Sequence, residues 1–231
     1  MNERMKKEQE FLKQYDSSQF EKPSLAVDVL IFTIVDDTLK VVMIKRDEYP
    51  FMDCLALPGV FVGMEESLED AAKRGVKKET GLSDIHFEQL YTWGDVKRDP
   101  RMRIISVSYL APVVYEQLCE KSEDGKIDEY LYSVDDILNG EMEIAFDHRE
   151  MIAYARDYIR KTVEDSDIAF NFVQERFTLP RLQKIYEILL GKDLYKANFR
   201  KKISVMVKET QDYTTGDAHR PSKIYVKNDE N

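Results

Sequence analysis

The chain has 231 residues and a formal net charge of −10, and 43% of its residues are hydrophobic, 11% aromatic and 34% charged. This length corresponds to one large domain or two small ones, and we expect two. The apolar content is sufficient for packed cores, so the high charge does not indicate disorder. The most apolar stretch, residues 26–35, contains Asp28 and is shorter than the roughly 20 residues that cross a bilayer, which argues against a membrane span.

The N-terminal segment begins with MNERMKKEQEFLKQYD, which is charged where a secretory signal would be apolar. We expect residues 1–24 to form a helix or a loose arm. The two cysteines, Cys54 and Cys119, and the three histidines are too few and too scattered for a disulfide framework or a structural zinc site. These features predict a cytoplasmic protein in a reducing environment.

Charge is distributed unevenly along the chain. Residues 176–227 contain twelve Lys or Arg and five acidic residues, which gives this segment a net charge of +7. Because the whole chain has a net charge of −10, the rest of the chain has a net charge of −17. This asymmetry indicates an acidic body joined to a basic C-terminal module with a different partner. The alternative is that local charge varies by chance.

The acidic part opens with a hairpin pattern. Residues 25–35 and 40–46 are rich in β-branched side chains and are separated by Asp36-Asp37-Thr38, which predicts two paired strands. Ser67 then has the character of a helix N-cap, with acidic residues in the following turn, and Gly81 has that of a C-terminal cap. We therefore expect a helix between these two residues.

Further strands and a second long helix complete the acidic part. Strand-like runs are expected at residues 86–93, 103–114 and 129–134. A helix is expected to begin at Asp147, whose side chain can cap it while Glu150 reaches back in a capping box. Strands interrupted and closed by helices indicate a layered α/β domain.

The basic segment has the pattern of a winged helix-turn-helix domain, in which a basic helix follows a short turn and a hairpin forms the wing. The expected elements are a helix from Thr178 to Gly191, a basic helix with Phe199, Ile203 and Met206 on its core face, and paired strands at residues 205–210 and 223–227.

Residues 57–82, LPGVFVGMEESLEDAAKRGVKKETGL, resemble the Nudix box, whose pattern is G-x5-E-x7-R-E-U-x-E-E-x-G-U with U aliphatic. The residues that match are Glu66, Arg74, Val76, Glu79, Gly81 and Leu82. Three positions depart from the pattern: Val60 replaces the opening glycine, Gly75 the glutamate after the arginine, and Lys78 the first of the paired glutamates.

These departures weaken the case for metal-dependent hydrolysis. In the family, several carboxylates of this helix hold Mg²⁺, which screens the pyrophosphate and helps to activate water. The change to Gly75 and Lys78 makes the local charge more positive by 3, which disfavours a divalent cation and still permits a phosphate. A glycine in a helix interior, such as Gly75, lowers stability by about 1 kcal/mol relative to alanine. Two explanations for its presence are relaxed selection on catalysis and close approach of the backbone to a ligand.

We therefore expect no required cofactor and no metal site. If the protein is a hydrolase, Glu66 and Glu79 are the candidate catalytic residues and Glu79 is the candidate Mg²⁺ ligand. The alternative for both glutamates is an ordinary solvated charge.

The resemblance extends beyond the box to most of residues 25–227. Four further segments, residues 97–109, 145–150, 177–183 and 198–202, are similar to the Nudix-related transcriptional regulators. This resemblance implies a Nudix-like α/β/α sandwich with a mixed sheet, followed by a small winged helix-turn-helix domain, commonly in a homodimer. It also implies a small-molecule effector such as ADP-ribose or a related NAD metabolite, or a sugar, which a sensor must bind without consuming.

On this basis we expect an N-terminal arm over residues 1–24, an effector-binding domain over 25–162 and a DNA-binding domain over 163–231. Arginine forks suit phosphate recognition, although ordinary surface charge is an equal alternative for each arginine. His148 could be catalytic, but its place in the first turn of a helix favours a structural or solvent-facing role. Trp93 either packs in the core or stacks on a nucleobase. The candidate ligand-binding residues are Arg46, Glu66, Arg74, Glu79, Arg98, Arg101 and Arg103.

The leading hypothesis is an effector-responsive transcriptional regulator that binds double-stranded DNA through its basic module. The alternatives are a Nudix hydrolase that cleaves ADP-ribose or a related nucleoside diphosphate derivative with Mg²⁺, and a protein-interaction module. The candidate DNA-binding residues are Lys196, Asn198, Arg200, Lys201, Lys202, Lys208, His219, Arg220 and Lys223.

Overall fold

A six-stranded mixed sheet forms the centre of the larger domain in the computed structural model, which describes residues 2–122, 125–214 and 221–228. The long strand β1 (Ser24–Val35) runs parallel to β7 (Ile104–Pro112) on one side. On the other side β1 pairs antiparallel first with β5 (Gly59–Phe61) and then with β2 (Thr38–Val42). The edge strands are β6 (Glu88–Trp93) and β8 (Leu131–Ser133).

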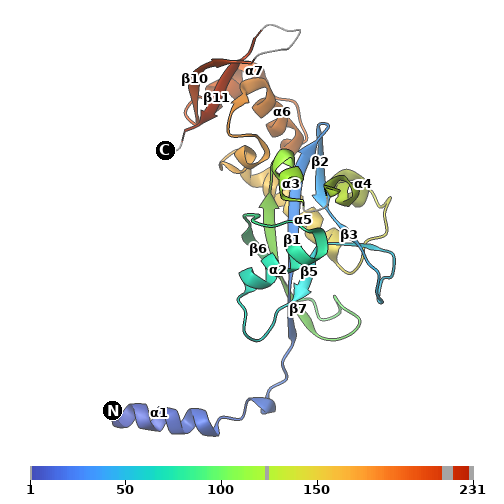
Figure 1. Cartoon of the computed structure of the whole chain (residues 1–231), viewed down its shortest axis with the longest axis vertical. Coiled ribbons are helices and arrows are strands. Elements are labelled where there is room, and N and C mark those ends of the chain that lie inside the picture. The colour runs from blue at the N-terminus through green and yellow to red at the C-terminus, as the bar shows by residue number, and fades with distance from the viewer. Residues whose placement is uncertain (1, 123–124, 215–220, 229–231) are drawn as a thin grey trace.

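Helices cover both faces of this sheet (Figure 1). Alternate residues of β1 point to opposite faces, because successive side chains of a strand do so. Val27, Val29 and Ile31 pack with α2 (Leu68–Thr80) and α3 (Tyr115–Lys121), whereas Leu30, Phe32 and Ile34 pack with α4 (Val134–Leu138) and α5 (His148–Thr162). The expected α/β/α sandwich is therefore confirmed.

The predicted hairpin is present but its second strand is shorter than expected. Asp36 and Asp37 both have positive φ, 49° and 56°, as a two-residue hairpin turn requires. The prediction of one strand over residues 40–46 is wrong, because β2 ends at Val42 and a separate strand begins at Ile44. Between them, the backbone N–H of Met43 donates to the carbonyl of Tyr130, in register with the pairs that join β2 to β8. Beyond it, β3 (Ile44–Lys45) pairs with β4 (Leu55–Ala56) in a separate two-stranded sheet.

The predicted ends of α2 are confirmed. The side chain of Ser67 accepts the backbone N–H of Asp70, and Gly81 closes the helix with φ +69°. The capping box predicted at the start of α5 is wrong: the Asp147 side chain makes no capping hydrogen bond there. Its carboxylate accepts instead from Arg98, and an ion pair of this kind outcompetes a neutral backbone donor.

The C-terminal domain has the expected winged helix-turn-helix layout. Thr178 caps α6 (Leu179–Leu190), Gly191 ends it, and α7 (Lys196–Ile203) follows. Met206 packs against the core as expected, but it lies beyond the end of α7, so its predicted place on that helix is wrong. The wing pairs β10 (Val207–Tyr213) with β11 (Lys223–Lys227), and β11 also pairs with β9 (Phe177–Thr178).

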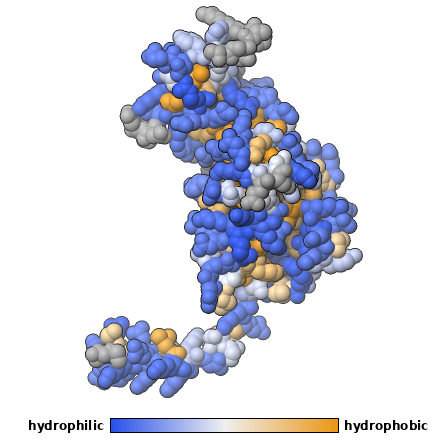
Figure 2. Space-filling view, viewed as in Figure 1, coloured by the Kyte–Doolittle hydropathy of each residue, from blue (hydrophilic) through white to orange (hydrophobic). Residues whose placement is uncertain are grey.

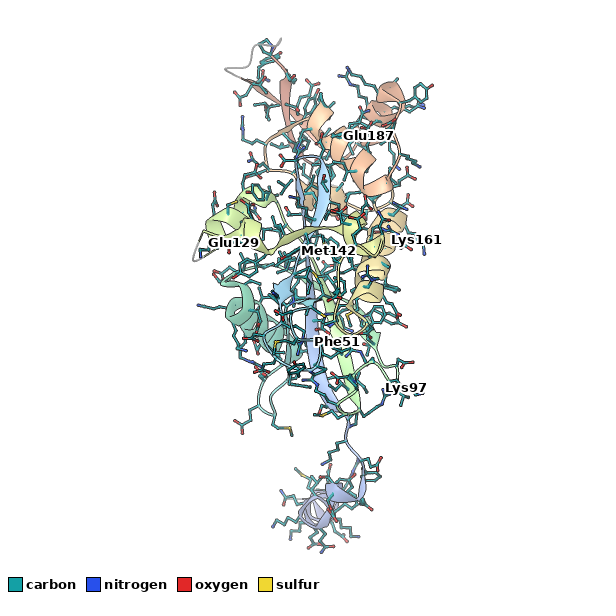
Figure 3. The ribbon with its side chains drawn as sticks, turned by 90° about the vertical axis from the view of Figure 1, so that its right-hand side faces the viewer. Phe51, Lys97, Glu129, Met142, Lys161 and Glu187 are labelled. Atoms are coloured by element: carbon teal, nitrogen blue, oxygen red, sulfur yellow. The ribbon has the colours of Figure 1, made fainter. Side chains whose placement is uncertain are left out.

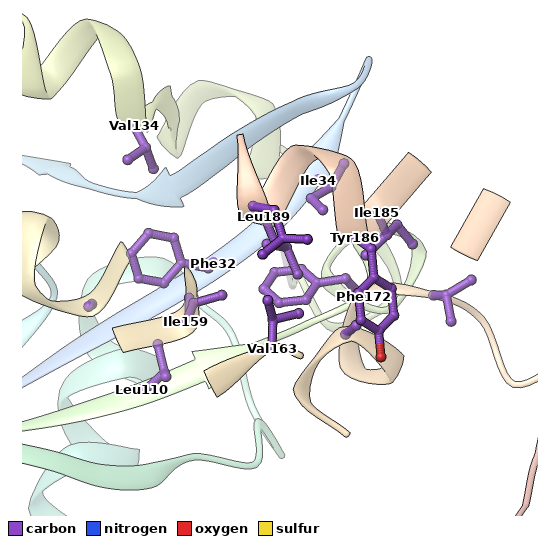
Figure 4. Close-up of a cluster of buried hydrophobic side chains, with 14 of the residues drawn as sticks. Phe32, Ile34, Leu110, Val134, Ile159, Val163, Phe172, Ile185, Tyr186 and Leu189 are labelled. Atoms are coloured by element: carbon purple, nitrogen blue, oxygen red, sulfur yellow. The ribbon is translucent and has the colours of Figure 1, made fainter. Parts of the chain in front are cut away.

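One hydrophobic core joins the two domains. It extends from Phe32 and Ile159 through Val163 to Leu182 and Leu189 of α6, and Figure 4 shows these elements in contact. The short 3-10 helix η3 (Ile168–Phe172) contributes to the same core. The two domains are therefore packed against each other through one continuous core, and close-packed interiors can transmit strain.

The N-terminal segment forms α1 (Glu3–Gln14), which extends away from the sheet and has no buried residue (Figure 1). Phe11 and Leu12 are both more than 60% exposed, and Figure 2 shows apolar side chains facing solvent on this arm. Among the described residues, no helix combines the length and the hydrophobicity that a bilayer span requires.

Candidate functional site

A cavity of about 630 Å³ opens at the end of β1 that lies far from the winged helix domain. Its walls come from β1, β5, α2 and the loops that carry Arg46, Arg101 and Phe146. Figure 3 shows Phe51, which packs on Phe146, in this half of the molecule and Glu187 of α6 in the other. The cavity lies within the 300–1,000 Å³ range of small-molecule sites, so it is the candidate effector site.

Five of the seven candidate ligand-binding residues line this cavity, and two do not. Glu66 and Arg103 lie outside it, the first bound to Arg74 and the second donating to the carbonyl of Asp95. The five that line it are Arg46, Arg74, Glu79, Arg98 and Arg101.

Arg98 forms a buried ionic cluster at the cavity. Its side chain is 5% exposed, and its Nε and Nη2 donate to the two carboxylate oxygens of Asp147 at 2.8 and 2.7 Å. Asp28, which also accepts from Ser106, lies 3.7 Å from the same guanidinium. Two carboxylates therefore hold Arg98 in place, and its main contribution is to position the walls of the site.

His148 belongs to this cluster as a structural residue. Its Nδ1 accepts the backbone N–H of Leu57 at 2.9 Å, so in the neutral ring the proton is on Nε2, which faces Asp28 at 3.7 Å. Burial lowers the pKa of His148, and the nearby carboxylates of Asp28 and Asp147 oppose that effect only in part. The sequence favoured a structural or a solvent-facing role, and the burial of His148 fits the first of these and not the second.

The lowered pKa predicts a pH-dependent stability. An unfolded His148 takes up a proton below about pH 6.5 while the folded one stays neutral, so the free energy of unfolding falls as the pH drops through that value. Urea unfolding between pH 7.5 and 5.5 should show this loss in the wild type and a smaller one in His148→Asn, which keeps an acceptor for Leu57. Parallel profiles for the two proteins would contradict the assignment.

Two arginines converge on the ring of Phe146. The guanidinium carbons of Arg46 and Arg101 lie 5.0 and 5.5 Å from its centroid. Arg101 binds Asp99 through Nε and Nη2, and Arg46 uses the same two nitrogens for the carbonyls of Pro50 and Glu48. Within the described residues, Nη1 of each arginine is left for a ligand, and a pair of fixed guanidinium donors suits phosphate oxygens.

Asp28 and Phe146 were missed at the level of sequence. Asp28 stands in an apolar strand, where its single charge was the signal, and Phe146 precedes a helix with φ +54°. A positive φ is uncommon for a bulky residue and marks a position that its surroundings hold in place. Trp93, by contrast, donates to Ser108 and lies outside the cavity, so it packs as a core residue.

The Nudix-box carboxylates do not form a magnesium site. Both carboxylate oxygens of Glu66 accept from Arg74, at 3.0 and 2.6 Å, and one also accepts from Gly63; these bonds lower the pKa of Glu66 to about 2. Glu79 is paired with Lys78 at 2.8 Å. In the described part of the chain, no three His, Cys, Asp or Glu residues are grouped as a metal site requires. This donor set does not fit Mg²⁺.

Two of the departures from the Nudix pattern compensate for each other. A Cβ atom on Gly75 would lie 3.0 Å from one methyl group of Val60 and 3.1 Å from the other. The Nudix pattern has a glycine at position 60, where this chain has the larger Val60 on β5. The Val60 side chain lies in the space that a side chain at position 75 on α2 would enter. This tight contact with a protein side chain is a physical reason for a glycine at this position of the helix.

The cationic side chains of α7 are exposed. Phe199 and Ile203 are buried against α6, which leaves the rest of the helix surface to solvent. Lys208 is exposed on β10, and Lys223 on β11 lies 3.5 Å from Glu209. His219 and Arg220 lie outside the described residues. The exposed candidates on α7 are Lys196, Asn198, Arg200, Lys201 and Lys202.

Comparison with known proteins gives matches over both domains. Residues 24–155 match the NUDIX domain, and residues 169–226 match the NrtR DNA-binding winged helix domain. The chain is 32% identical over 222 residues to the ADPR responsive transcriptional repressor NtrR of Acinetobacter baylyi, covering 94% of this chain and 87% of that protein.

Solved structures agree with these matches. Shewanella oneidensis NrtR complexed with a 27-mer DNA has 31% sequence identity and a TM-score of 0.76, covering 88% of this chain and 93% of that chain. The NUDIX domain of the same protein complexed with ADP ribose has 31% identity and a TM-score of 0.55, covering 68% and 99%. The expected fold, a mixed-sheet Nudix domain followed by a winged helix domain, is thus found in solved relatives.

Proposed function

Because the chain belongs to the family of Nudix-domain transcriptional regulators with an NrtR-type winged helix, we propose that it is an ADP-ribose-responsive repressor that binds double-stranded DNA. One observation carries this proposal: a single chain joins an arginine-lined cavity without a magnesium cluster to a helix whose cations face solvent. Among the residues that the structure describes, no group of acidic side chains, histidines or cysteines is placed to hold a magnesium ion. The first half of this combination suits ligand binding without hydrolysis, and the second suits DNA.

The cavity offers complementary groups for the parts of ADP-ribose. Its diphosphate suits Arg46 and Arg101, whose Nη1 atoms are available beside the Phe146 ring. Ribose hydroxyls suit the buried polar end of the cavity, where the Asp28 carboxylate is an acceptor and the Nε2–H of neutral His148 is a donor without a close partner in the described residues. Arg74 also lines the cavity, where its ion pair with Glu66 holds the guanidinium in place. Together these groups favour a polar anionic ligand of this size.

ADP-ribose at 100 times its dissociation constant is expected to stabilise the protein by about 2.7 kcal/mol, a rise of roughly 5–10 °C in Tm. Arg101→Ala should lose most of this rise, because it removes one of the two arginines from the Phe146 ring. Arg103→Ala, an arginine outside the cavity, is the matched control and should keep it. A thermal-shift titration that finds equal rises for the two variants would remove Arg101 from the site.

A Nudix hydrolase is the second candidate, and the position of Glu79 in the wall of the cavity favours it. The same samples decide between the two functions when AMP is measured after incubation with ADP-ribose and Mg²⁺. Release of AMP that Glu79→Gln abolishes would establish the hydrolase. We expect no appreciable turnover, because Lys78 and Arg74 neutralise the two matching glutamates.

We also propose that the protein acts in the cytoplasm as a homodimer, since helix-turn-helix proteins commonly read two half-sites with a two-fold axis. The proposed division is an effector domain over residues 25–162 and a DNA-binding domain over 163–231. The family matches, which end at residue 155 and begin again at 169, support a junction in this region.

A further inference from the structure

A small pocket between α6, α7 and the end of α5 holds a shared ion pair. The pocket has a volume of about 330 Å³. Lys192, in the turn after α6, and Lys202, on α7, place their Nζ atoms 3.9 and 3.8 Å from the same oxygen of Glu164. All three side chains are about half exposed, so the pair is open to solvent and to a competing anion.

The pocket also contains an unused hydrogen-bond donor. Tyr186 of α6 is 2% exposed, lines the pocket, and has a hydroxyl without a hydrogen-bond partner in the described part of the chain. Figure 4 shows its oxygen at the margin of the core. Buried hydroxyls are normally paired, so this one is available to a water or to another polar group that enters the pocket. Asn198 of α7 lines the pocket as well and is exposed.

The charged residues that line the pocket are Lys192, Lys202, Glu164 and Asp193. When Glu164 is displaced, lysines from two elements, an exposed amide and the Tyr186 hydroxyl offer donors for an oxyanion. The pocket opens beside α7, whose exposed face is proposed to meet DNA, so the oxyanion that reaches it is a backbone phosphate. Glu164 now stands between the two lysines as a carboxylate. A carboxylate and a phosphate oxygen make the same kind of contact with an ammonium group, so the two compete.

Glu164 is connected to the effector cavity through α5. It follows directly on Val163, the buried C-cap of that helix, whose first residue is His148 of the cavity cluster. The body of α5 packs in the core shared by the two domains. A change at the cavity that moves α5 therefore moves the carboxylate held by the two lysines.

We propose that Lys192 and Lys202 bind a DNA backbone phosphate, and that Glu164 occupies the phosphate position in the free protein. The inference rests on the proposed DNA-binding function and adds to it a contact, Lys192, and an internal competitor, Glu164. The partner is duplex DNA, recognised here through its backbone and not through its bases.

Three variants test the site. Glu164→Gln should raise DNA affinity about 3- to 10-fold, because the phosphate no longer displaces a carboxylate. Lys192→Ala should weaken binding and reduce the slope of log K against log salt by about 1, as expected for one lost phosphate contact. In the double variant the gain from Glu164→Gln should disappear, since the site it frees has lost one lysine.

The matched controls lie next to the site. Asp165→Asn makes the same change in net charge one residue away, and Lys161→Ala removes an exposed lysine of α5 that does not line the pocket. Affinity is measured by fluorescence anisotropy between 50 and 300 mM salt, on a duplex that the wild-type protein selects from a random-sequence library, with circular dichroism as a check on folding.

The outcomes separate the inference from the proposed function. If the wild type selects and binds no duplex, the proposed DNA-binding function fails and the inference falls with it. If the wild type binds, and Lys192→Ala matches Lys161→Ala in affinity and salt slope, the phosphate site is overturned alone. A gain for Glu164→Gln no larger than that for Asp165→Asn overturns the role of Glu164, whereas the pattern described above supports both parts.

Discussion

Replacing Arg200 and Lys201 by alanine should weaken binding to duplex DNA about 100-fold near 0.15 M salt. Both side chains are exposed on α7, whose opposite face is anchored by Phe199 and Ile203. Each lost phosphate contact also loses the free energy of counterion release, and base contacts add about 1–3 kcal/mol each. The slope of log K against log salt should fall by about 2 if both side chains contact phosphates.

A double alanine variant of Lys6 and Lys7 is the control for this measurement. It removes the same charge from α1, which lies at the far end of the molecule from α7 (Figure 1). Fluorescence anisotropy on the selected duplex should show a large loss for the α7 variant and a small one for the α1 variant. Equal binding by the α7 variant and the wild type would reject α7 as the DNA-contacting helix.

The second large effect concerns folding. Arg98→Ala is expected to lower the free energy of unfolding by about 3–5 kcal/mol, because it leaves the buried carboxylates of Asp28 and Asp147 without their shared cation. For a chain of this size the corresponding fall in Tm is roughly 10 °C.

Urea unfolding measures this effect, and two further variants make it specific. Arg103→Ala removes an arginine with an exposed carbonyl contact and should cost less than about 1 kcal/mol. Adding Asp147→Asn to Arg98→Ala should recover part of the loss, since it removes one of the two uncompensated charges. If Arg98→Ala is no more damaging than Arg103→Ala, the cluster does not stabilise the fold.

Local signals predicted most of the secondary structure correctly. Ser67 and Gly81 end α2 where their capping chemistry indicated, and Thr178 and Gly191 do the same for α6. These residues form hydrogen bonds with backbone groups within four positions of themselves, so the ends of a helix can be predicted from residues that are close in the sequence. The hairpin at Asp36-Asp37 belongs to the same class, because its turn depends on two residues.

The predictions that failed depended on partners distant in the sequence. Asp147 has the character of a helix cap, but Arg98, 49 residues earlier in the chain, takes its carboxylate. Ile44 and Lys45 fit a continuation of the hairpin strand, but they pair with Leu55 and Ala56 in a separate two-stranded sheet. In each case a contact made by folding outcompetes the local preference, as tertiary context commonly does.

The candidate site also has parts that the sequence predicted and parts that depend on the folded structure. The Nudix-box spacing and the charge asymmetry predicted an anion-binding domain and a basic module, because residue types at fixed intervals along a helix or in a segment are visible in one dimension. The cavity itself was not predictable, since Asp28, Phe146 and Arg101 come from three separate elements and meet only when the sheet assembles.

Composition, charge distribution and capping residues were thus enough to predict two domains and their order, and the resemblance of several segments to known regulators implied the family. The positions of Arg46 and Arg101 around Phe146, the burial of Arg98 between two carboxylates and the pairing of Glu164 with Lys192 and Lys202 required the folded molecule. The physical reason is that helix and turn signals act over a few bonds, whereas the charge and burial of a site depend on distances between elements that the chain alone does not specify.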